Sequence, residues 1–179
     1  MPRHAALLRG INVGRHKRIA MADLRALFDE IGLADVRTHL QSGNAVFSSA
    51  EATPKALETR IEDAIAGQFG MSVRCLVRSQ DEIHAVIEAN PLRETATDGS
   101  KFMALFLSEA PDPALVAAYD PVAFAPDQVR LGDRVVYQWC PDGLMAAPPV
   151  GGFVERHWKV AVTARNWNTV TKLGALLDA

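Results

Sequence analysis

Apolar residues recur along the chain in two patterns, which together predict a succession of strands and helices. Four of them in the first half have the i, i+3, i+4, i+7 spacing of a helix that buries one face: Leu24, Leu27, Phe28 and Ile31. Gly32 follows directly, where a helix commonly ends on a glycine in the left-handed conformation. Short apolar runs bounded by glycine, such as residues 5–9, instead indicate strands.

The two patterns give the same order of elements twice. In the first half they predict strands at residues 5–9, 36–41, 44–48 and 71–78, and helices at residues 22–31, 54–69 and 80–88. In the second half they predict strands at residues 101–108, 128–131, 134–140 and 160–163, and helices at residues 113–119, 153–158 and 166–177. Turns are expected at Ser42-Gly43 and at Gly132-Asp133. Each half therefore has the order βαββαβ followed by one further helix.

This order is that of the ferredoxin-like unit, so we expect an α+β fold of two tandem ferredoxin-like subdomains. Residues 1–91 would form the first subdomain, residues 92–100 a polar linker and residues 101–179 the second subdomain. The predicted core contains Leu24, Leu27, Phe28, Ile31, Leu57, Ile61, Val73, Val77, Leu105 and Phe106.

A first candidate binding segment follows the first strand and contributes Arg9, Gly10, Asn12 and Gly14. Its two glycines allow backbone amides to approach a ligand, and the N-terminus of the next helix adds partial positive charge. Their spacing matches neither the dinucleotide fingerprint nor the phosphate loop. A turn whose glycines serve only backbone geometry explains the segment equally well.

A second candidate segment lies at the tip of the first hairpin, where Gln41, Ser42 and Asn44 offer both donors and acceptors to a polar ligand. The residue types favour the plainer alternative, because Ser, Gly and Asn are common turn residues.

A third candidate segment lies between a strand and the last helix and contributes Arg165, Asn166 and Asn168. Arginine and asparagine beside the indole of Trp167 would suit a phosphate, a carboxylate or a stacked ring. Asn166 is equally well explained as the N-cap of the helix, and Trp167 as its anchor in the core.

These motifs together resemble a known family. Residues 6–14, the helix start at residues 21–24, residues 41–44 and residues 163–169 look like the signatures of the mainly bacterial domain-of-unknown-function family 1697. The resemblance runs nearly end to end and implies two ferredoxin-like subdomains. The family has no established activity, so no catalytic residue is carried over. Its loop after Gly14 is often rich in glycine and lysine, whereas this chain has Arg15-His16-Lys17-Arg18.

Composition excludes several classes of protein. The chain has 179 residues, of which 49% are hydrophobic and 22% charged, as is usual for a soluble globular protein. No apolar run approaches the roughly 18 residues of a membrane helix, and Cys75 and Cys140 are far apart, so we expect a reduced, cytoplasmic setting. The histidines lack metal-ligand spacing, and no nucleophile motif is present. We therefore predict no metal and no cofactor, and the sequence leaves open whether the protein is an enzyme and how it oligomerises.

Charge changes this picture locally. The formal net charge is −2, yet residues 1–18 contain no acid and five cations: Arg3, Arg9, Arg15, Lys17 and Arg18. Alternation in two strands also places Arg37 with His39, and Arg74 with Arg78, on a sheet face that a ferredoxin-like unit can leave open. A solvated basic loop explains the charges equally well.

Two functions follow from these observations. The first is the binding of an anionic small molecule or nucleotide where the subdomains meet, with Arg9 and Arg165 facing one cleft together with Asn12, Gln41 and Asn166. The second is a nucleic-acid or protein interaction module that uses the basic face of the first half. The acidic total and the scarcity of aromatic residues on the predicted sheet favour the small molecule.

Overall fold

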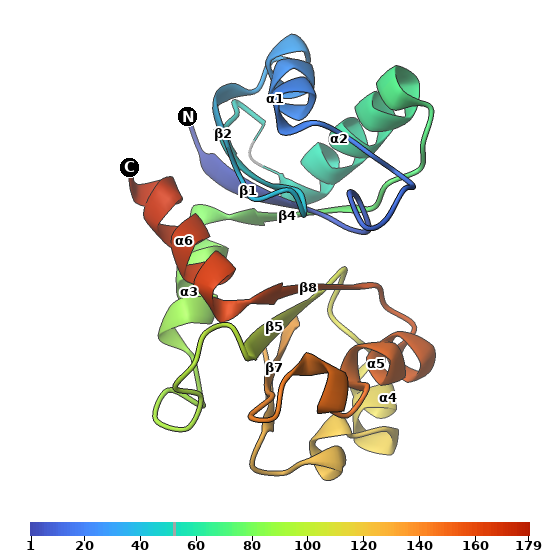
Figure 1. Ribbon diagram of the computed structural model, residues 1–179, viewed down its shortest axis with the longest axis vertical. Coiled ribbons are helices and arrows are strands. Elements are labelled where there is room, and N and C mark those ends of the chain that lie inside the picture. The colour runs from blue at the N-terminus through green and yellow to red at the C-terminus, as the bar shows by residue number, and fades with distance from the viewer. Residues whose placement is uncertain (52) are drawn as a thin grey trace. The chain divides into compact units, whose positions relative to one another are not determined.

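The computed structural model describes residues 1–51 and 53–179. Over these residues the fold is mixed α+β, with two four-stranded antiparallel sheets and six α-helices (Figure 1). The chain divides into two compact units, one of residues 1–84 and 172–179 and one of residues 85–171. The boundaries between the units fall inside α3 (Gln80–Glu88) and α6 (Trp167–Asp178). The division of the chain into subdomains at residues 91 and 101 stays a prediction.

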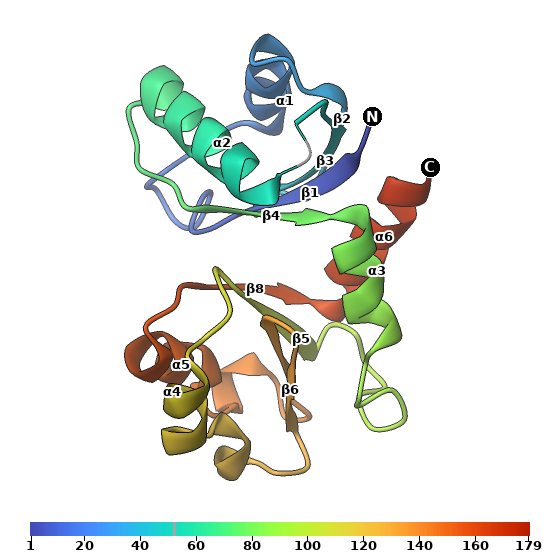
Figure 2. The same ribbon diagram turned by 180° about the vertical axis from the view of Figure 1, so that it is seen from behind.

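The first unit contains a sheet with the strand order β2-β3-β1-β4. Its elements are β1 (Arg3–Leu8), α1 (Met21–Glu30), β2 (Ala34–His39), β3 (Asn44–Ser48), α2 (Pro54–Phe69) and β4 (Cys75–Ser79), followed by the start of α3. Helices α1 and α2 cover the same face of this sheet (Figures 1 and 2).

The helix ends of the first unit follow from residues that the sequence marks clearly. After α1, Gly32 has a φ of 87°; its N–H donates to Asp29 O at 3.0 Å, and the Leu33 N–H donates to Phe28 O at 3.0 Å. These two bonds are the Schellman motif that a glycine at this position makes possible. At α3, the Ser79 hydroxyl accepts from Glu82 N at 3.1 Å and the Glu82 carboxylate accepts from Ser79 N at 2.8 Å, and these two bonds form a capping box.

The core of the first unit lies between the sheet and helices α1 and α2. Phe28 is fully buried and meets Phe47 edge-on, with ring centroids 5.6 Å apart. The predicted core residues of this unit are buried except Ile31, which is partly buried against the core. The alternation that puts Arg74 and Arg78 on one face of their strand leaves Val73, Cys75 and Val77 on the other, and these three residues lie in the core.

The second unit has a sheet with the order β6-β7-β5-β8. Its elements are β5 (Phe102–Leu107), α4 (Pro113–Ala118), the 3-10 turn η1 (Pro121–Phe124), β6 (Val129–Gly132), β7 (Val135–Trp139), the 3-10 turn η2 (Leu144–Ala146), α5 (Val150–Trp158), β8 (Val162–Asn166) and the start of α6. One face of the sheet contributes Leu105, Leu107 and Val136 to a core with α5. Toward its other face, the Trp167 ring lies 4.8 Å from Phe102, and the buried Tyr137 hydroxyl donates to Val86 O at 2.8 Å.

The two units correspond residue by residue at the ends of their strands, which their element order alone does not reveal. The N–H of Leu8 donates to Gly43 O and that of Leu107 to Arg134 O, so β1 and β5 end in the same way. The next N–H groups, of Arg9 and Ser108, donate to Arg74 O and Ala161 O. At the ends of β4 and β8, Arg78 and Arg165 are both buried, and each donates to the preceding carbonyl.

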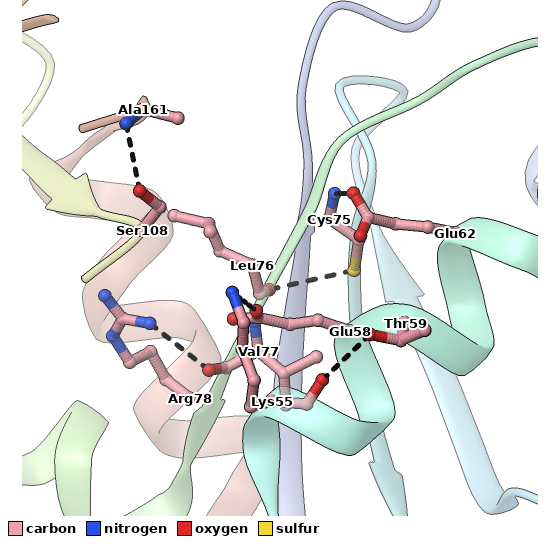
Figure 3. Close-up of polar contacts among 10 residues, drawn as sticks. All are labelled: Lys55, Glu58, Thr59, Glu62, Cys75, Leu76, Val77, Arg78, Ser108 and Ala161. Atoms are coloured by element: carbon pink, nitrogen blue, oxygen red, sulfur yellow. Dashed lines mark hydrogen bonds and ion pairs between the residues drawn. The ribbon is translucent and has the colours of Figure 1, made fainter. Parts of the chain in front are cut away.

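Glutamates on the covering helices protect the outer edges of β4 and β8. In the first unit, Glu58 and Glu62 on α2 accept from Val77 N at 3.1 Å and from Cys75 N at 3.2 Å (Figure 3). In the second unit, Glu155 on α5 accepts from Val162 N at 2.9 Å. An edge strand with open N–H groups is a template for pairing with another chain, and these carboxylates occupy those groups.

Two predicted turns lie elsewhere in the structure. The first hairpin does not turn tightly at Ser42-Gly43, because β2 ends at His39 and residues 40–43 form the loop, with Leu40 at a φ of 62°. The second hairpin turns at Asp133-Arg134 instead of Gly132-Asp133, because Gly132 pairs with Val135 within the ladder. In the second hairpin the positive φ falls on Arg134 and not on Gly132; in the first, Gly43 has a positive φ but the loop already begins at Leu40.

Phe28→Ala is expected to lower the free energy of unfolding by about 3–5 kcal/mol, because it leaves a cavity in a fully buried site. Denaturant melts measure this loss. A change below about 1 kcal/mol would show that the α1 face is not packed as described.

Glu58→Ala is expected to cost about 1–3 kcal/mol, because the buried Val77 N–H loses its acceptor. Glu58→Gln keeps an acceptor oxygen and serves as the matched control, with a clearly smaller loss. Equal losses in the two variants would mean that packing, and not the hydrogen bond, accounts for the effect.

Candidate functional site

The loop of residues 9–20 is held by the side chain of Asn12. The Asn12 carboxamide donates from Nδ2 to Ile19 O at 2.8 Å and to Gln41 O at 2.7 Å, and its Oδ1 accepts from Ile19 N at 2.9 Å. The backbone N–H of Asn12 donates to Lys17 O at 3.0 Å. Asn12 was predicted to bind a ligand, but its carboxamide instead closes the loop and fixes the hairpin tip to it.

The hairpin tip is locked in a similar way. Asn44 is fully buried, and its Nδ2 donates to His39 O at 2.9 Å and to Ser42 Oγ at 3.1 Å. Gly43 has a φ of 93°, and a Cβ at this position would lie 2.7 Å from Leu8 Cβ. The turn interpretation of this segment therefore accounts for Ser42, Gly43 and Asn44, whereas the Gln41 side chain is exposed.

These two locked segments border a surface pocket of about 570 Å³, lined by Asn12, Arg18, Ile19, Ala20 and Gln41. Of the predicted binding residues, Asn12 and Gln41 are thus brought together. Arg18, Ile19 and Ala20 were not predicted as site residues. The basic run was the signal for Arg18, but no sequence pattern pointed to Ile19 or Ala20.

The loop that borders the pocket carries exposed cations, of which Arg18 lines the pocket itself. Arg15, His16 and Arg18 are exposed, and no ion pair or hydrogen bond of their side chains occurs within the described residues. The neighbouring Lys17 ammonium donates to Ser72 O at 2.8 Å. The Arg9 N–H donates to Arg74 O at 2.9 Å, so the exposed residue Arg74 lies beside the start of the loop. Gly10 and Gly14 have positive φ values of 73° and 68°, as the backbone-geometry interpretation requires.

The start of α1 adds to the positive potential at the pocket. Ala20 is the N-cap of α1 and provides no side-chain acceptor for the first-turn N–H groups. The unsatisfied N–H groups at a helix N-terminus carry a partial positive charge. The carboxylate of Asp23 lies in the same turn but lines a separate pocket with Glu30, so it is not a lining residue of the first one.

The third predicted segment is used mainly in folding the second unit. Asn166 Oδ1 accepts from Thr169 N at 3.0 Å, which confirms it as the N-cap of α6. Arg165 is 9% exposed, and its guanidinium donates to Ala164 O at 2.9 Å. Asn168 is exposed, and its backbone N–H donates to Gly99 O at 3.4 Å. A shared cleft of Arg9 and Arg165 stays a prediction.

The prediction that the first sheet has an open basic face is wrong at the centre of the sheet. Arg78 is 3% exposed, and Ala5, Leu7 and Val46 on the same face are buried. Arg37 and Arg74 are exposed, but because Arg78 is buried, the cations of these strands do not form one continuous exposed surface. The described residues contain no cluster of His, Cys, Asp and Glu that could hold a metal ion, and no helix among them has the length and apolarity to span a bilayer.

Comparison with known proteins agrees with the fold. A family model described as a protein of unknown function, DUF1697, matches residues 1–137. The structure is similar to that of a conserved bacterial protein, SP0830, from Streptococcus pneumoniae, with a TM-score of 0.68 and 24% sequence identity over 98% of each chain. At this identity the likeness shows the fold alone. A search among curated proteins finds no match.

Gly43→Ala is expected to destabilise the protein, because both the positive φ and the close Leu8 Cβ exclude a methyl group. Gly67→Ala is the matched control: Gly67 lies inside α2 with open space around it, so alanine should stabilise by about 0.5–1 kcal/mol. Thermal melts compare the two. A stable Gly43→Ala variant would show that the hairpin tip is not locked against β1.

Proposed function

Since the chain belongs to the DUF1697 family of proteins of unknown function, its activity has to be inferred from its own residues, and we propose that it binds an anionic small molecule. The ligand carries a phosphate or carboxylate group and occupies the pocket lined by Asn12, Arg18, Ile19, Ala20 and Gln41. Arg18 provides the charged contact, and Asn12 holds the loop in place.

The observation that carries this proposal is the difference between the two units at equivalent positions. After β1 the chain makes the basic loop of residues 9–20 before α1 begins. After β5 the equivalent connection is residues 108–112 alone, which contain Glu109 and Asp112 and no cation. The fold therefore closes without a long basic loop, so the loop in the first unit serves a purpose other than connecting a strand to a helix.

Electrostatics supports an anion at this place. Exposed cations without internal partners raise the local potential even though the formal net charge of the chain is −2. The uncapped start of α1 offers backbone N–H groups next to Ala20. Arginine suits this role because its planar guanidinium matches phosphate and carboxylate groups bidentately.

We also propose that each unit has the ferredoxin-like topology and that the protein is cytoplasmic. The element order βαββαβ and the strand orders β2-β3-β1-β4 and β6-β7-β5-β8 support the topology. Two buried free cysteines, Cys75 and Cys140, support a reducing compartment.

Titration with inorganic phosphate or sulfate is expected to raise the melting temperature of the wild-type protein, because a ligand that binds only the folded state stabilises it. Arg18→Ala should abolish most of this rise while keeping the unliganded melting temperature. Arg37→Ala is the matched control, since Arg37 is exposed on β2 outside the pocket, and it should respond as the wild type does.

An equal rise in all three proteins would contradict the proposed site. Arg165→Ala in the same titration tests the predicted contribution of the second unit. A loss of anion response without a loss of unliganded stability would support it, and a lower unliganded stability with an unchanged response would assign Arg165 to the fold alone.

A further inference from the structure

The pocket has room for more than an inorganic anion, and this step rests on the proposed function. Its volume of about 570 Å³ lies within the range of roughly 300–1,000 Å³ found for pockets that take small organic molecules. A single tetrahedral anion at Arg18 would leave most of this space to water. The organic part of the ligand is therefore expected to lie beside the remaining lining residues.

The lining residues differ in the hydrogen-bonding groups that remain available to a ligand. The Asn12 carboxamide is already hydrogen-bonded to the backbone of Ile19 and of Gln41. The Gln41 side chain is exposed, and none of its atoms has a hydrogen-bond partner within the described residues. Since Asn12 fixes the Gln41 backbone at 2.7 Å, the Gln41 carboxamide is presented from a rigid base.

We propose that the ligand is a nucleotide: its phosphate binds Arg18, and the Gln41 carboxamide recognises the hydrogen-bonding edge of its base. A carboxamide both donates and accepts, as the edge of a nucleobase does. Gln41 is then the residue that sets specificity, and Arg18 the residue that provides the charge.

Calorimetric titration of the full chain with four probes tests this assignment: AMP, UMP, ribose 5-phosphate and inorganic phosphate. At least one nucleotide is expected to bind about tenfold or more tightly than both ribose 5-phosphate and phosphate. Equal affinity of all four would overturn the nucleotide while leaving an anion site. Binding of none of them would overturn the proposed function itself.

Variants separate the two roles. Gln41→Ala is expected to weaken nucleotide binding about tenfold and to leave phosphate binding unchanged, whereas Arg18→Ala should weaken both. Gln68→Ala, an exposed glutamine on α2 outside this pocket, is the matched control and should bind as the wild type does. Unchanged nucleotide affinity in Gln41→Ala would overturn the role of Gln41.

A short single-stranded oligonucleotide is the remaining arm of the experiment. Binding to it that is tighter than to any mononucleotide, and that falls steeply with salt, would overturn the mononucleotide assignment in favour of a nucleic-acid surface. Oligonucleotide affinity no greater than that of the mononucleotide would support the pocket as the unit of recognition.

Discussion

The point where each central strand ends fixes the geometry of the rest of its unit. At the end of β1, two successive N–H groups, of Leu8 and Arg9, donate to Gly43 O and Arg74 O, so the neighbouring segments on both sides are tied to one place. The same pair of bonds ends β5. Because both sides of the strand are held there, whatever follows has to leave the sheet at the same position. The basic loop therefore starts from a rigid base, and Asn12 needs only three hydrogen bonds to complete its shape.

The helices and their ends could be predicted from the sequence, because the capping residues and the spacing of buried residues indicate the same elements. The capping box at Ser79, the glycine after α1 and the N-cap at Asn166 are each formed by neighbours in sequence, so their pattern specifies their structure. The α1 face was also predictable, since helical spacing alone sets which side chains point inward. The resemblance to the family agreed with these elements and added no residue role.

Long-range contacts could not be predicted in this way. Nothing near Glu58 in the sequence indicates that its carboxylate accepts from Val77, and Arg78 fits an exposed alternation as well as a buried one. The turn positions failed for a related reason: Leu40 and Arg134 take positive φ values that their residue types disfavour, and only the pairing of the strands requires this. The pocket residues Ile19 and Ala20 depend on the folded loop and carry no chemical signature.

The asparagines show that a polar motif predicted to bind a ligand can instead hold the loops that border a pocket. Asn12 and Asn44 have the residue type expected of a ligand contact, yet their carboxamides are used to hold two loops. A carboxamide that closes a loop has no donor left for a ligand, but it determines where the next exposed group stands. Arg18 and Gln41 are exposed on the segments that Asn12 joins, and they line the pocket with it. In this chain the side chains that hold the loops shape the pocket, and the exposed side chains of Arg18 and Gln41 beside them are the groups left for the proposed ligand.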